Sequence, residues 1–109
     1  MRDYIHVSDL ASAHLKALDH LAAGKESFAV NVGTGTGVSV QEVISAVEEV
    51  TGKRVPRKLV PRRLGDPPTL VANPAKAQAL LSWKATHGLQ EVVATAWNWM
   101  QGQRLLAAR

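Results

Sequence analysis

The chain has 109 residues, of which 46% are hydrophobic and 20% are charged. This size and composition are typical of one globular domain, and no apolar run approaches the roughly 18 residues that a membrane-spanning helix needs. The absence of cysteine excludes a disulfide framework, and no secretory signal is indicated at the start. We therefore expect a cytoplasmic protein that makes no membrane contact.

The net charge is +4, and the positive residues are concentrated between Lys53 and Arg63, a stretch that contains no acid. Such a run predicts either an anionic partner or a solvated basic face. We do not expect nucleic acid as the partner, because the run lacks the interleaved aromatic residues that stack on single-stranded bases.

The first part of the chain predicts a strand, a helix and a second strand. Residues 2–7 are rich in strand formers and precede Ser8, a good N-cap for a helix over 9–23 that Gly24 would end. Residues 26–32 place alternate apolar side chains on one side of a strand.

The middle of the chain predicts a glycine loop followed by a well-marked helix. Glycines stand at positions 33, 35 and 37, and Ser39 and Glu42 then have the spacing of a capping box. An apolar stripe follows, and Gly52 would close this helix.

The last part predicts one more strand, a loop and two helices. Residues 54–60 are typical of a strand, in which Pro56 is compatible only with an edge, a bulge or the first residue of the strand. The prolines and glycine of 61–68 require a loop. Asn73 and Pro74 have the residue types of an N-cap and first helical position for a helix through about Leu81. The final helix is expected from about 89 to 103, with Trp99 off its apolar stripe.

These elements predict an α/β (α+β) fold for residues 1–109 as one unit, with a small mixed sheet and about four helices.

The glycine loop does not meet the requirements of a dinucleotide site. That fingerprint is G-x-G-x-x-G with an acidic residue about 20 positions further on, but Val38 takes the place of the third glycine, and the positions near 53 and 54 are Lys and Arg. We favour a tight turn between a strand and a capped helix, although a helix N-terminus retains some attraction for phosphate.

Known catalytic and metal-binding patterns are absent from the sequence. The four histidines show no i, i+4 pair with a third ligand nearby, so no metal site is indicated. No G-x-S-x-G elbow frames a serine. Tyr4 is the only tyrosine, and Ser8 stands four positions on, where a Y-x-x-x-K pair for proton transfer would have lysine.

The stretch from Arg62 to Asp66 carries the clearest functional signal. Guanidinium groups pair with two phosphate oxygens at once, and a carboxylate three residues after Arg63 has the chemistry to accept hydrogen bonds from a ribose hydroxyl. A solvated basic face is the alternative interpretation of the same residues.

Four stretches together resemble a known family. They are RDYIHVSDLASAH, NVGTGTGVSVQEVI, PRRLGDPPTLVANPAKAQALLSW and TAWNWMQ. In order and spacing they are similar to the C-terminal, substrate-binding third of UDP-glucose 4-epimerases, which are extended short-chain dehydrogenases/reductases. The resemblance covers nearly the whole chain and aligns the glycine loop with the family's C-terminal turn, not with its N-terminal NAD loop.

The resemblance implies a set of substrate-binding residues. Arg2 and Arg63 look like the arginines that contact the diphosphate, Tyr4 lies in the same binding segment, Asp66 looks like the ribose-contacting carboxylate, and Leu70 takes a position that lines the sugar pocket in relatives. It implies no catalytic residue and no cofactor site here, because the family holds NAD on an N-terminal Rossmann domain that this chain lacks.

The resemblance also implies a truncated form of the family, because relatives have most of their length before the position of Arg2. We expect a fragment that contributes to UDP-sugar binding, weakly if at all, and that does not catalyse epimerisation alone. The alternative is a stand-alone interaction module. Strands and helices without their usual neighbours favour a homodimer or a strand-exchanged oligomer.

Overall fold

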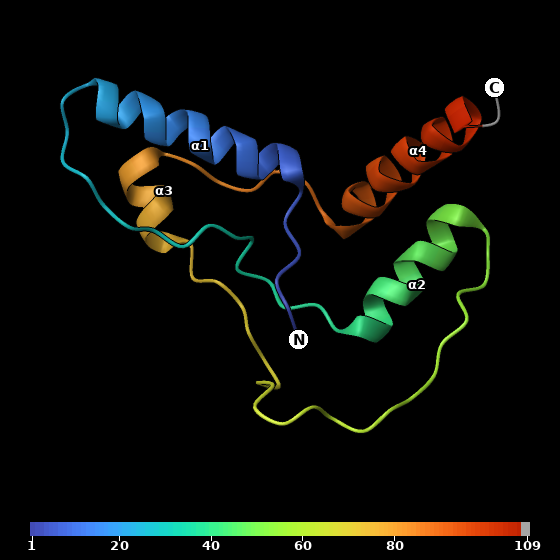
Figure 1. Ribbon diagram of the computed structural model, residues 1–109. Helices are drawn as coiled ribbons and strands as arrows, with labels where there is room; N and C mark the ends of the chain where they lie inside the picture. The colour runs from blue at the N-terminus through green and yellow to red at the C-terminus, as the bar shows by residue number, and fades with distance from the viewer. Residues whose placement is uncertain (108–109) are drawn as a thin grey trace.

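The computed structural model describes residues 1–107 and contains four helices in that part of the chain (Figure 1). They are α1 (Val7–Ala22), α2 (Val40–Thr51), α3 (Ala75–Leu81) and α4 (Leu89–Ala107). The expected number of helices is therefore confirmed. No helix in these residues has the length and apolar character needed to cross a membrane.

Helix α1 begins two residues earlier than the sequence predicts, because its N-cap is His6 and not Ser8. The Nδ1 atom of His6 accepts a hydrogen bond of 3.0 Å from the backbone N–H of Ser8. A ring nitrogen thus accepts the N-cap hydrogen bond that a side-chain hydroxyl or carboxylate oxygen usually accepts. Gly24, with φ of 79°, follows the C-terminal end as predicted.

The capping box of α2 is confirmed. The hydroxyl of Ser39 accepts from the N–H of Glu42 at 3.1 Å, and the Glu42 carboxylate accepts from the N–H of Ser39 at 3.2 Å. Gly52 ends the helix with φ of 69°, in the left-handed region that glycine tolerates best.

Helices α3 and α4 differ from the prediction mainly at their ends. The N-cap of α3 is Pro74, one residue later than expected, while the Asn73 side chain accepts from the N–H of Ala75 at 3.2 Å. Helix α4 continues to Ala107, beyond the expected end near 103. Trp99 lies off the packed face and is 63% exposed, as predicted.

The predicted α/β (α+β) fold with a mixed sheet is wrong for the residues that the structure describes, whose regular structure is helical. Segments 2–7, 26–32 and 54–60 form no strand there, and the only pairings are isolated bridges from Arg2 to Val38 and to Leu70. Period-2 alternation predicts an extended backbone but not its hydrogen-bonding partner. Within the described chain, 26–32 makes no backbone hydrogen bond to another backbone group.

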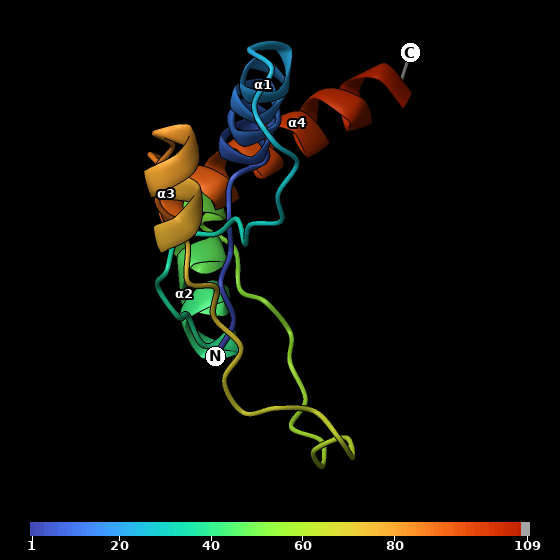
Figure 2. The same cartoon turned by 90° about the vertical axis from the view of Figure 1, so that its left-hand side faces the viewer.

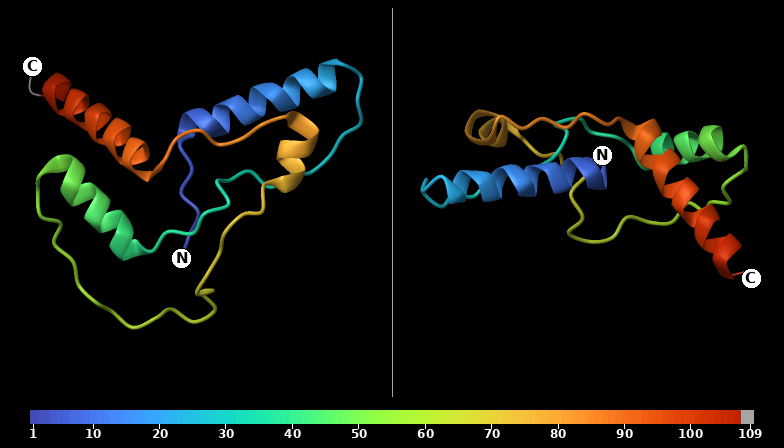
Figure 3. Two further views of the ribbon diagram at one scale, coloured as in Figure 1. Left: turned by 180° about the vertical axis from the view of Figure 1, so that it is seen from behind. Right: turned by 90° about the horizontal axis from the view of Figure 1, so that it is seen from above.

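The helices pack in two pairs, α1 with α3 and α2 with α4 (Figure 1). The core lies in the first pair and consists of Ala13, Ala77, Leu81 and Trp83, with half-buried side chains of 26–32 packed against it. The views from the side and from behind show the long connection between α2 and α3 extending away from both pairs (Figure 2 and the left panel of Figure 3).

The chain is more open than a self-contained domain of its length. Its radius of gyration is 17.3 Å and its extents are 50 × 43 × 21 Å, whereas a compact domain of this size has a radius of gyration of about 13 Å. Leu59 and Leu64, in the connection between α2 and α3, are fully exposed. Many large apolar side chains are thus left exposed, because no other part of the described chain packs over them.

Candidate functional site

The site is built where three segments that are far apart in the sequence meet at Arg2. The backbone of Arg2 exchanges two hydrogen bonds with Val38, of 2.9 and 2.8 Å, and the N–H of Leu70 donates to the carbonyl of Met1 at 3.0 Å. These bridges fix the start of the chain between the end of the glycine loop and the segment that follows the basic loop.

The side chains of Arg2 and Arg63 converge on the carboxylate of Asp66. An Nη of Arg2 lies 2.7 Å from Oδ1 of Asp66, and an Nη of Arg63 lies 3.2 Å from Oδ2 of the same carboxylate. The second Nη of Arg2 donates to the carbonyls of Met1 and Pro67, at 2.9 and 3.0 Å. Arg2 is therefore held from several sides, whereas the Arg63 side chain is 85% exposed and is held by its contact with Asp66.

A shallow depression of about 550 Å³ lies beside Arg2. It is lined by residues of three segments: Arg2, Asp3, Asn31, Val32, and 70–73. Leu70 lies on its wall with an exposed side chain, and Tyr4 is half-buried in the segment that leads into α1. Tyr4 does not line this depression.

The glycine loop is organised around the carboxylate of Asp3. Oδ1 accepts from the N–H of Thr34 at 3.0 Å and from its hydroxyl at 2.6 Å, and Oδ2 accepts from the N–H of Gly35 at 2.9 Å. Donors that a phosphate would need are thus already bound to a side chain of the same protein. This geometry supports the interpretation of the loop as a structural turn.

A polar cluster at the start of α1 was missed by sequence reasoning. The Asp9 carboxylate accepts from the backbone N–H groups of Thr86 and His87, at 3.1 and 3.0 Å, from the Thr86 hydroxyl at 3.0 Å, and lies 2.9 Å from Nδ1 of His87. Burial raises the pKa of Asp9, but these hydrogen bonds outweigh it and lower the pKa to about 2.

The imidazole rings of His6 and His87 stack in this cluster, with centroids 4.3 Å apart. Nε2 of His6 lies 2.8 Å from the hydroxyl of Thr95, so the cluster also ties the start of α1 to α4. No spacing pattern predicts this contact, because most of the chain separates the two histidines. Across residues 1–107 no group of three His, Asp or Glu side chains is arranged to hold a metal.

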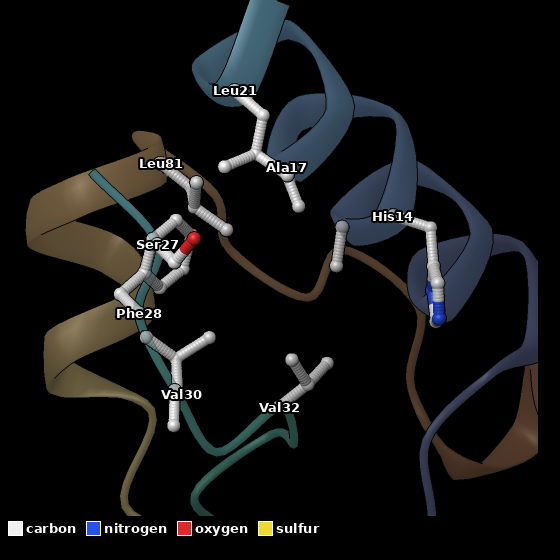
Figure 4. Close-up of a pocket in the computed structure, with 10 residues that line it drawn as sticks. His14, Ala17, Leu21, Ser27, Phe28, Val30, Val32 and Leu81 are labelled. Atoms are coloured by element: carbon white, nitrogen blue, oxygen red, sulfur yellow. The ribbon is translucent and has the colours of Figure 1, made fainter. Parts of the chain in front are cut away.

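A second, apolar pocket of about 480 Å³ lies between α1, α3 and the extended segment 26–32 (Figure 4). Leu21 and Ala17 of α1, Leu81 of α3 and Phe28 of the extended segment lie around it (Figure 4). No Lys or Arg side chain is among its lining residues, so it does not have the chemistry of a phosphate site.

The comparisons with known proteins relate this chain to epimerases. The model of the NAD dependent epimerase/dehydratase family matches residues 1–33, the stretch that includes Arg2 and α1. The UDP-glucose 4-epimerase of Bacillus subtilis (strain 168) is 50% identical over 99 residues, which are 91% of this chain and 29% of that protein.

Solved epimerases contain the same fold. The UDP-glucose 4-epimerase of Stenotrophomonas maltophila, with bound NAD and formylated UDP-arabinopyranose, matches with a TM-score of 0.90 and 44% identity over 95% of this chain and 31% of that one. The enzyme of Bifidobacterium longum in complex with NAD+ and UDP matches with a TM-score of 0.84 and 42% identity, over 92% of this chain and 30% of that one.

The chain is thus homologous to the C-terminal part of UDP-glucose 4-epimerases and corresponds to a fragment of such a protein. It spans about 30% of the length of the relatives that it matches.

Proposed function

We propose that this chain grips the uridine diphosphate part of a nucleotide sugar, as the C-terminal portion of an epimerase. The observation that carries the proposal is the convergence of Arg2, Arg63 and Asp66 beside an open depression. Residues 1–109 act as one unit in this role.

Each of the three side chains has a separate part in the proposal. Arg2 and Arg63 bind the diphosphate, because their guanidinium groups donate to oxygens in pairs and outnumber the single carboxylate in charge. Asp66 aligns the two arginines in the free chain and accepts from a ribose hydroxyl when the nucleotide enters. Leu70 lines the sugar end of the depression, and Tyr4 supports the segment that carries Arg2.

The isolated chain does not catalyse epimerisation or hold NAD in this proposal. The sequence lacks the Y-x-x-x-K pair. In the loop that most resembles a dinucleotide turn, the N–H groups of Thr34 and Gly35 already donate to the carboxylate of Asp3. UDP binding is weak, because a few charge-assisted hydrogen bonds of about 1.5–3 kcal/mol each oppose an association cost of at least about 4 kcal/mol. We place the chain in the cytoplasm, where nucleotide sugars would reach it.

Arg63→Gln tests the proposal against a matched control on the same basic run. We expect the substitution to weaken UDP binding about tenfold or more, as the loss of one charge-assisted contact predicts. Arg57→Gln removes the same charge from a residue that pairs with Glu48, outside the trio, and should change the affinity less than about twofold. Ligand-observed NMR titration with UDP measures both, and equal losses in the two variants would reduce the effect to general basic charge.

The second candidate function is a self-associating module, and the uncovered surface favours it. The exposed apolar side chains Val7, Leu10, Leu18 and Leu21 follow one side of α1. The backbone of 26–32 lies nearby without a pairing partner among the described residues. An unpaired extended segment beside an apolar stripe is a template for pairing with a second chain.

We therefore expect a concentration-dependent dimer in light scattering. Ala29→Pro, which removes an N–H from the extended segment, should shift the equilibrium toward monomer. A wild-type chain that stays monomeric over the accessible concentration range would contradict this second function and leave the UDP proposal untouched.

A further inference from the structure

We infer that Asp3, although it borders the depression, is a positioning residue: its carboxylate is bound to the glycine loop, and through that loop it sets the position of the Arg2 backbone. The inference rests on the proposed function of Arg2. It is drawn from two sets of contacts, those of the Asp3 carboxylate with the glycine loop and those of the Arg2 backbone with Val38.

The carboxylate of Asp3 fixes one end of the loop. Three donors of Thr34 and Gly35 converge on its two oxygens, at 2.6 to 3.0 Å. Burial raises the pKa of Asp3, but the hydrogen bonds from Thr34 and Gly35 outweigh it and lower the pKa, so the group is a carboxylate at neutral pH.

The loop passes too close to this carboxylate for any side chain at position 33. A Cβ added at Gly33 would lie 2.6 Å from Cβ of Ala72 and 2.7 Å from Oδ2 of Asp3, and Gly35 has φ of 80°. The loop backbone therefore passes within contact of both Asp3 and the 70–73 segment, and only glycine at position 33 allows that approach.

The other end of the loop holds Arg2. Val38 exchanges two backbone hydrogen bonds with Arg2, the residue directly before Asp3. The contacts thus form a closed ring. Asp3 binds residues 34 and 35, the loop continues from there to Val38, and Val38 binds the backbone of Arg2. An arginine whose backbone is fixed on both sides loses less freedom when it binds, which favours affinity.

The chemistry of the ring predicts which substitutions break it. In Asp3→Asn one oxygen still accepts from Thr34, but the amide group sets an N–H donor against another donor of the loop. Asp3→Ala removes both acceptors and leaves a space in which formate, a free carboxylate, restores them. Asp19→Asn, on the exposed side of α1, removes the same charge without touching the ring and serves as the control.

UDP titration followed by amide NMR tests the inference. We expect Asp3→Asn to weaken UDP binding at least fivefold while circular dichroism shows the helices retained, Asp3→Ala to recover part of the affinity in added formate, and Asp19→Asn to match the wild type. A folded Asp3→Asn chain with wild-type affinity would overturn the inference.

Two further readouts decide the case without UDP binding. If the wild type does not bind UDP, the proposed function fails, and hydrogen exchange at the amides of Arg2 and Val38 still tests Asp3: exchange at least tenfold faster in Asp3→Asn than in Asp19→Asn supports the ring, and equal rates overturn it. If Asp3→Asn does not fold, acid titration of the wild type applies instead. The amides of Thr34, Gly35 and Val38 should then shift with one midpoint below 3.8, and an unresponsive Val38 would refute the inference.

Discussion

Trp83→Ala is expected to lower the free energy of unfolding by about 3–5 kcal/mol, because it empties the centre of a small core. Trp83 is 1% exposed and packs with Ala13, Ala77 and Leu81. Its Nε1 also donates to the carbonyl of Asp9 at 3.0 Å and to the hydroxyl of Ser12 at 2.9 Å, so the indole joins α1 to the segment after α3. Urea unfolding followed by circular dichroism measures the change, and the midpoint temperature of thermal unfolding should fall by about 15 °C or more.

Trp99→Ala provides the matched control, since Trp99 is exposed on α4 and its removal should cost no more than about 0.5 kcal/mol. A Trp83→Ala chain as stable as the Trp99→Ala chain would mean that the core does not lie where we place it.

Acidification should destabilise the chain through Asp9. The pKa of Asp9 is lowered from an ordinary 3.8 to about 2, chiefly because the hydrogen bonds from His87 and Thr86 outweigh the opposing effect of burial. A depressed carboxyl pKa contributes stability that is present above pH 3.8 and is lost as the pH falls through about 2. The shift corresponds to about 2 kcal/mol at neutral pH.

Asp9→Asn identifies the source of this pH dependence. The variant should be less stable at neutral pH, because a neutral amide replaces the four contacts of a buried carboxylate, and its unfolding free energy should vary less between pH 5 and pH 2. Urea unfolding at a series of pH values measures both effects. An identical pH profile in the two chains would assign the acid sensitivity to other carboxylates.

The helices were predictable because their signals are local. Ser39 and Glu42 define the start of α2, and Gly24 and Gly52 mark helix ends, all within one turn of the feature that they predict. The sheet was not predictable in the same way, because a strand exists only through its partner. Segment 26–32 has the expected alternation and packs its apolar side on α1, but the described chain supplies no neighbouring strand.

In the candidate site, too, the predictable residues are those with a local sequence signal. Arg63 and Asp66 stand three residues apart, and their residue types alone made both candidate ligand-binding groups, whereas Arg2 is 64 residues from Asp66 and became a candidate only through the resemblance. The ion pair between Arg63 and Asp66 was not predicted, because the spacing of two residues in a loop does not determine whether their side chains meet. The bond between Asp9 and His87 had no sequence signal of either kind, since neither local spacing nor the family motifs point to it.

Residue-resolved titration of the wild-type chain with UDP tests the central claim most directly. We predict saturable shifts, with a millimolar Kd, in the side-chain or backbone signals of Arg2, Arg63 and Asp66, and little change along α4. Tight binding of NAD by the 109-residue chain, or UDP shifts that avoid these three residues, would contradict the account.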